Sequence, residues 1–143
     1  MDAAVEPGGM DDVFVGQLMS APVLTIEPDT TIAEAGRAML EASIKSVVVV
    51  DEDCRPEGIL TSTDFVRIAA KERSPTDVTV AEYMTTDIVT TTAGTGVREA
   101  ADLMREHELS HLPVVEADGT VTGMVTATDL TVYVSGVAAV ADA

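Results

Sequence analysis

The sequence predicts a mixed α/β (α+β) fold in which one β-α-β-β-α unit occurs twice in tandem, packed as one pseudo-symmetric module. Identical residues recur at a constant spacing without gaps, as in Val15 and Val80 or Asp64 and Asp129. A fixed spacing of this kind indicates an internal repeat. In both halves short apolar runs alternate with segments of helical periodicity. One half alone would form only a marginal core, so the two copies are expected to pack on each other.

Each copy begins with a short apolar strand followed by an amphipathic helix. The strands are expected at residues 23–26 and 88–91, and the helices at about 31–42 and 96–108. In the first helix Ile32, Ala35 and Met39 recur at helical spacing. Thr30 and Thr95 precede the helices and are of a residue type that caps helix starts.

The second half of each copy is predicted to be a hairpin and a helix. A buried strand is expected at residues 47–50 and again at 112–115. Polar turns lead into a third strand, at 58–60 and 121–125, and a second helix follows at about 63–71 and 128–138. This last helix carries more apolar residues than one buried face needs, which predicts a homodimer contact.

The domain boundaries follow from the repeat and from composition. Residues 13–72 form the first repeat and 80–138 the second, with a polar linker containing Pro75 at 73–79. Residues 1–12 are expected to be disordered, and 139–143 form a C-terminal tail.

Composition excludes several classes of function. The 143-residue chain has 25 acidic and 8 basic residues and a formal net charge of −17, which disfavours binding to nucleic acid and to anionic membranes. Few of the cations are lysines, a balance that predicts a halophilic protein. Cys54 is the only cysteine, and no secretory signal or membrane-spanning run is found, so a cytoplasmic protein is expected.

One motif bears chemistry and occurs in both copies. It is Gly-Ile-Leu-Thr-Ser-Thr-Asp at 58–64 and Gly-Met-Val-Thr-Ala-Thr-Asp at 123–129. A threonine followed three residues later by an aspartate at a helix start is also a plain capping box. Alternatively, the helix N-terminus and the threonines suit a phosphate, and the carboxylate can accept from the two hydroxyls of a ribose. The glycine would let a flat ring approach the backbone.

These residues resemble a tandem pair of cystathionine-β-synthase (CBS) domains, also called a Bateman module. The resemblance rests on a Met-Ser or Met-Thr pair before the first strand, Glu-Ala in the first helix, Leu-Pro-Val-Val-Glu at 112–116, and the doubled motif. It covers about residues 13–138, nearly the whole chain.

The resemblance implies a regulatory module that binds AMP, ADP, ATP or S-adenosylmethionine in clefts between the repeats, needs no other cofactor, and signals to a partner protein. The aspartates would hold the ribose, the threonines would lie near phosphate, the first strands and their approaches would form the adenine slot, and the positions before the second strands would meet phosphate. Carried onto this chain, these are Asp64, Asp129, Thr61, Thr63, Thr126, Thr128, Pro22, Val23, Leu24, Asp87, Ile88, Val89, Lys45, Ser110 and His111. Cations near the clefts are few, which favours a monophosphate or a ligand without phosphate.

Two other functions stay open. The tandem could be a dimerisation or scaffold module whose Thr-x-x-Asp elements are only helix caps. Residues 107–111 also match the zinc-hydrolase pattern His-Glu-x-x-His, with His107 and His111 as ligands and Glu108 as base. Pro113 speaks against that hydrolase, because it disfavours a helix that continues through Leu112 and would put both histidines on one face. No catalytic residue is otherwise indicated, and a non-enzymatic protein is expected.

Overall fold

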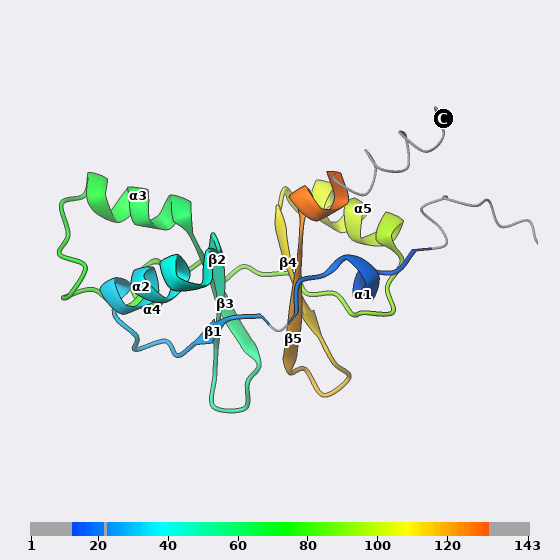
Figure 1. The fold of residues 1–143 in the computed structure, drawn as a ribbon, viewed down its shortest axis with the longest axis horizontal. Coiled ribbons are helices and arrows are strands. Elements are labelled where there is room, and N and C mark those ends of the chain that lie inside the picture. Colours follow the sequence, from blue (N-terminus) through cyan, green and yellow to red (C-terminus); the bar gives the residue numbers. More distant parts are fainter. Residues whose placement is uncertain (1–12, 22, 132–143) are drawn as a thin grey trace, which may run out of the picture. The chain divides into compact units, whose positions relative to one another are not determined.

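The computed structural model describes residues 13–21 and 23–131, which divide into two compact units (Figure 1). We name each unit after the motif aspartate that it holds. The Asp64 unit comprises Val23–Ile88 with Gly119–Val121. The Asp129 unit comprises the described residues before 22, Val89–Asp118 and the described residues from Thr122 onward.

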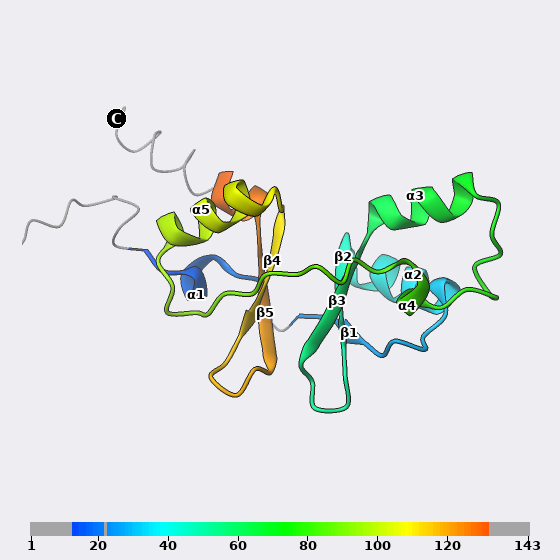
Figure 2. The same ribbon diagram turned by 180° about the vertical axis from the view of Figure 1, so that it is seen from behind.

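The Asp64 unit is a three-stranded sheet with helices on one side of it (Figures 1 and 2). Its elements are β1 (Thr25–Ile26), α2 (Ile32–Ala42), β2 (Ser46–Val50), β3 (Pro56–Thr61), α3 (Ser62–Ala70) and α4 (Val80–Tyr83). Strand β1 pairs parallel to β2, and β2 pairs antiparallel to β3. The register joins Ser46 to Thr61, so β2 begins where β3 ends and α3 starts.

The core of the Asp64 unit lies between this sheet and its helices. It contains Ile32 and Met39 of α2, Val47 and Val49 of β2, and Ile68 of α3, among others. All four residues from Val47 to Val50 are buried, as predicted for this strand. Alternate residues of a strand point to opposite faces of the sheet, so β2 is buried on both of its faces.

The Asp129 unit repeats much of this arrangement. Its elements are α1 (Val15–Leu18), α5 (Val97–His107), β4 (His111–Val115) and β5 (Val121–Thr126), and a further helical stretch begins at Ala127 and is described as far as Thr131. Thr91 bridges Val114 in the parallel sense, in place of a full first strand. The core includes Val97 and Met104 of α5, Leu112 and Val114 of β4, and Val15 of α1.

The two compact units do not coincide with the two sequence repeats, because each unit contains one short segment from the other repeat. The segment around α1 belongs to the first repeat, yet it packs in the Asp129 unit, where the N–H of Val15 donates to the Thr95 carbonyl at 2.8 Å. The segment around α4 opens the second repeat and packs in the Asp64 unit, where the N–H of Val80 donates to the Thr30 carbonyl at 2.8 Å. Neither short helix was predicted.

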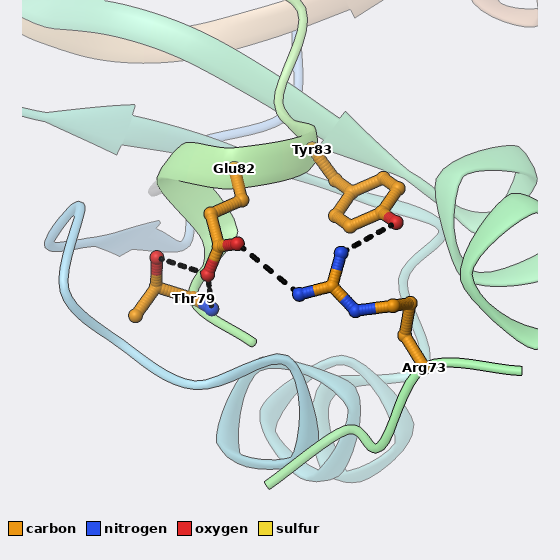
Figure 3. Close-up of polar contacts among 4 residues, drawn as sticks. All are labelled: Arg73, Thr79, Glu82 and Tyr83. Carbon is orange, nitrogen blue, oxygen red and sulfur yellow. Dashed lines mark hydrogen bonds and ion pairs between the residues drawn. The ribbon is translucent and has the colours of Figure 1, made fainter. Parts of the chain in front are cut away.

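A polar cluster holds α4 in the Asp64 unit (Figure 3). The Glu82 carboxylate accepts from the Thr79 N–H at 3.0 Å and from Nη2 of Arg73 at 3.4 Å. Nη1 of Arg73 donates to the Tyr83 hydroxyl at 3.4 Å, and Lys71 Nζ lies 5.5 Å from the centre of the Tyr83 ring. The hydrogen bond from the Thr79 backbone is the main reason that the pKa of Glu82 lies below its usual value.

The mixed α/β fold predicted from the sequence is confirmed, with small corrections at the helix starts. The N-cap of α2 is Thr31 rather than Thr30, because the Thr31 hydroxyl accepts from the Glu34 N–H at 3.1 Å. The N-cap of α5 is Gly96 rather than Thr95, whose hydroxyl instead contacts that of Thr92 at 2.9 Å. The region expected to be a linker is tied to α2, since the N–H of Ala33 donates to the Pro75 carbonyl at 3.0 Å.

Several predictions fall on residues outside those described. These are the disordered start at 1–12, the adenine-slot residue Pro22, most of the last helix with its proposed homodimer face, and the tail at 139–143. Among the described residues, no helix is both long and apolar enough to cross a bilayer.

Candidate functional site

The Asp64 unit gathers several predicted site residues at one end of its sheet. The carbonyl of Lys45, just before β2, accepts from the Ser62 N–H at 3.0 Å and from the Ser62 hydroxyl at 3.3 Å. These bonds hold the approach to β2 against the first turn of α3, which carries Thr63 and Asp64. Thr63 is exposed there, and α3 presents its free N-terminal N–H groups at the same place.

The Asp129 unit has the equivalent arrangement. The carbonyl of Ser110, just before β4, accepts from the Ala127 N–H at 2.9 Å. The structure therefore brings Ser110 and His111 together with the first helical turn after Thr126. Thr128 is exposed in that turn, like its counterpart Thr63. Each unit thus holds one cluster in which the residue just before a strand (the strand entrance) is bonded to the start of the motif helix.

Asp64 is buried and heavily hydrogen-bonded. Its Oδ2 accepts from the Thr61 N–H at 2.8 Å and from the Thr61 hydroxyl at 3.3 Å. Its Oδ1 accepts from Nη1 of Arg67 at 3.3 Å. The Asp64 side chain is 3% exposed, whereas that of Arg67 is 61% exposed. Both carboxylate oxygens are therefore engaged within α3 and its N-cap.

Asp129 is half-buried and accepts fewer hydrogen bonds from the described residues than Asp64 does. Its Oδ2 accepts from the Thr126 N–H at 2.9 Å, and its own N–H donates to the Thr126 hydroxyl at 3.1 Å. This reciprocal pair is a capping box, the structural alternative foreseen for the motif. Among the described residues, this box engages only Oδ2 of the carboxylate.

His111 adds a titratable group to the Asp129 cluster. Its Nδ1 lies 2.9 Å from the Ser110 hydroxyl. Burial lowers the pKa of His111 below its usual value, and the charge of Asp129 acts in the opposite direction more weakly. The ring is therefore biased towards its neutral form, in which one nitrogen accepts and the other donates. The exposed Lys45 supplies a positive charge to the other cluster.

The predicted adenine-slot residues divide unevenly. Val23 and Leu24 precede β1, which runs parallel to β2, so they lie at the same end of the sheet as Lys45. Leu24 packs against the core of the Asp64 unit, and Val23 is half-buried. Asp87 and Ile88 belong to the Asp64 unit, while Val89 packs against the core of the Asp129 unit. Val23 and Leu24 therefore lie beside the Asp64 cluster. Val89 lies two residues before the parallel bridge between Thr91 and Val114, near the start of β4 in the Asp129 unit.

Each motif glycine packs against a methionine-bearing segment. A Cβ on Gly58 would lie 2.6 Å from Sδ of Met84 and 2.9 Å from the Thr85 carbonyl oxygen. A Cβ on Gly123 would lie 2.8 Å from Sδ of Met19 and 2.9 Å from the Ser20 carbonyl oxygen. The repeated Met-Ser or Met-Thr pair therefore fills the space beside each motif glycine. The sequence could have indicated this contact, because the methionine and the glycine recur together in both repeats.

The zinc-hydrolase pattern does not form a helical zinc site. Helix α5 ends at His107, Glu108 adopts a left-handed conformation with φ 54°, and His111 opens β4. The two histidines therefore share no helix face, which the pattern requires. Within residues 13–21 and 23–131, no three His, Cys, Asp or Glu side chains are grouped as a metal site would need.

Comparison with known proteins agrees with this geometry. The sequence model of the CBS domain matches residues 15–71 and 80–136. An uncharacterized 17.7 kDa protein of Acidianus ambivalens is 36% identical over 116 residues, which are 81% of this chain and 70% of that protein.

An enzyme and a solved structure are also similar. Inosine-5'-monophosphate dehydrogenase of Aquifex aeolicus is 33% identical over 108 residues, 75% of this chain but only 21% of the enzyme. A CBS domain pair solved with 5′-methylthioadenosine and S-adenosyl-L-methionine matches with a TM-score of 0.79 and 28% identity, covering 87% of this chain and 97% of that one.

Proposed function

The chain belongs to the CBS domain family as a pair of such domains, and from that premise we propose that it is a regulatory module that binds adenosine-type ligands. The observation that carries the proposal is the pairing, in each unit, of a strand entrance with the helix start that bears the motif aspartate. The structural neighbour with bound 5′-methylthioadenosine and S-adenosyl-L-methionine supports this ligand class.

Each cluster offers the groups that an adenosine ligand needs. The carboxylate of Asp64 or Asp129 accepts from the ribose hydroxyls. The exposed Thr63 or Thr128 and the free N–H groups of the helix start meet a 5′ substituent, and suit an anionic one. Lys45 and His111 stand at the two strand entrances, and Val23 and Leu24 offer apolar surface beside the first of them. Because the chain is a pair of CBS domains, we propose a regulatory rather than an enzymatic role.

The proposed output is a change passed to another protein. A ligand can shift the arrangement of a module only if it binds two arrangements with unequal affinity. We place this role in the cytoplasm and in a homodimer, with an unidentified protein as the regulated partner. The net charge of −17 makes nucleic acid an unfavourable partner.

Calorimetric titration tests the proposal directly. Ligand-stripped protein in about 2 M KCl, where exposed charges are screened within a few Å, is titrated with AMP, ADP, ATP and S-adenosylmethionine. We expect saturable binding at up to two sites per chain. The double variant Asp64→Asn, Asp129→Asn keeps an amide oxygen for the cap but removes the carboxylates, so it should remain folded by circular dichroism and lose the ribose contact.

The capping bonds favour one alternative, a scaffold module without a ligand. Asp64 and Asp129 both accept the N–H of the threonine that precedes their helix. If no adenosine compound produces heat or thermal stabilisation at millimolar concentration, the motif is a pair of helix caps and the sensor proposal is wrong.

A further inference from the structure

The two motif aspartates differ in how much of each carboxylate is still available. An ionised carboxylate has about four acceptor positions. Asp64 uses three of them, for the Thr61 N–H, the Thr61 hydroxyl and Arg67. Asp129 uses one, for the Thr126 N–H, among the residues that the structure describes. A ribose diol needs two positions, so only Asp129 can accept both hydroxyls without losing a present partner.

Arg67 is the partner of Asp64 that can leave. The Thr61 donors are fixed at the N-cap of α3, whereas Arg67 is a long side chain that is 61% exposed. Its ion pair with Asp64 joins residues three apart on one helix, at 3.3 Å. The second repeat has Val132 at the position equivalent to Arg67, so its sequence provides no cation for Asp129 there.

We propose that Arg67 is a specificity-determining residue that occupies the ribose-accepting oxygen of Asp64 and weakens uncharged adenosine ligands at that site relative to the Asp129 site. The inference rests on the proposed adenosine binding. An uncharged ligand that displaces Arg67 leaves the guanidinium without its carboxylate and offers no anion in exchange. Among the described residues no cation is paired with Asp129, so the Asp129 site should fill first with an uncharged ligand.

Calorimetry with 5′-methylthioadenosine, an uncharged probe, tests the role of Arg67. The Asp64 site is isolated in an Asp129→Asn chain, and the Asp129 site in an Asp64→Asn chain. We expect tighter binding in the chain that keeps Asp129. Adding Arg67→Met to the chain that keeps Asp64 should lower its Kd about threefold to fivefold, the range expected for a partly exposed ion pair.

Two variants separate a charge effect from a structural one. Arg67→Lys keeps the cation and should leave the Kd close to that of the parent. Arg105→Met removes a comparable pair, Arg105 with Asp102 at 2.8 Å on α5, and should leave the Kd unchanged. Raising the KCl concentration should tighten binding of the uncharged probe to the Asp64 site when Arg67 is present, and should have no such effect in the Met variant.

The outcomes distinguish this inference from the proposed function. If the probe binds the Asp64 and Asp129 sites equally, or if Arg67→Met changes the Kd less than about twofold, Arg67 has no such role although the module still binds adenosine ligands. If neither this probe nor AMP binds any of these chains or the parent, the proposed function fails, and the inference fails with it.

Discussion

Asp64 and Asp129 each accept a hydrogen bond from the N–H of a threonine three residues earlier, so part of each carboxylate already satisfies a helix start. The sequence left two readings of the Thr-x-x-Asp motif, a cap or a ligand site. The structure shows that the cap exists, but a cap consumes only some of the acceptor positions. Arg67 then takes a further acceptor position of Asp64.

His111 makes the stability of the Asp129 unit depend on pH. Its pKa is lowered in the folded chain by burial, so below the usual value of about 6.5 the unfolded chain binds a proton that the folded chain does not. Stability is therefore full above that value and is lost as the pH falls through the window between it and the lower folded pKa. Between pH 7.5 and 5.5, we expect the urea denaturation midpoint of His111→Gln to fall by less than that of the parent.

The second histidine provides the control for that measurement. His107 is exposed at the end of α5, so His107→Gln removes the other histidine without altering the buried ring at the start of β4. If the urea midpoint falls equally in the parent and in His111→Gln, His111 is not the source of the pH dependence.

At the scale of elements, each motif strand is bounded by a methionine-bearing segment. The Met84–Thr85 segment bridges Ile59 of β3, and Ser20 bridges Met124 of β5, both in the antiparallel sense. The backbones approach so closely that only glycine fits at positions 58 and 123. The positions of β3 and β5 are therefore fixed by the contact with these segments as well as by pairing with the neighbouring strand.

Substituting these glycines should destabilise the protein. In Gly58→Ala the new Cβ meets the Met84 side chain and the Thr85 carbonyl oxygen at less than 3 Å. Overpacking of this kind costs about 1–3 kcal/mol of unfolding free energy. Urea denaturation of Gly58→Ala and Gly123→Ala measures it.

Two further variants make that test specific. Gly94→Ala has no heavy atom within 4 Å of its new Cβ and should stay close to the parent. Adding Met84→Ala to Gly58→Ala should recover only part of the loss, because the Thr85 carbonyl oxygen stays in place. A Gly58→Ala protein as stable as the parent would refute the contact.

At the scale of the whole molecule, the two compact units are each completed by a segment from the other sequence repeat. Val15 is fully buried in the core of the Asp129 unit, and Val78 and Val80 are fully buried in the core of the Asp64 unit. A single repeat therefore lacks part of the core that its own strands and helices need. This exchange gives a physical reason for the repeats to occur as a pair on one chain.

Because each core contains a segment from the other repeat, a core substitution in that segment should destabilise strands of the other repeat. Val15→Ala removes buried methyl groups from the Asp129 unit, so amide hydrogen exchange should rise first in β4 and β5, which belong to the other sequence repeat. Val80→Ala should in turn raise exchange in β2 and β3. Mass spectrometry of exchanging peptides measures both. Increases confined to the mutated residue's own repeat would contradict the exchange.

The sequence by itself determined the elements and the motif. The repeat, the Val47–Val50 run and the periodicity of α2 and α5 depend on local pattern, which is why β2, β4 and both long helices were predicted within a residue or two. The same holds for the placing of Asp64 and Asp129 at helix starts, and for the membership of the CBS family. The packing of the repeats on each other and the high-salt habitat stay predictions.

Only the tertiary structure decided which segment completes which core. The short helices α1 and α4 have too few residues to give a periodic signal, and their stability comes from burial of Val15 and Val80 in cores formed by distant residues. The role of Gly58 likewise depends on Met84, 26 positions away. Contacts between residues far apart in the chain leave no local pattern, so the physical reason for each became visible only when the chain was folded.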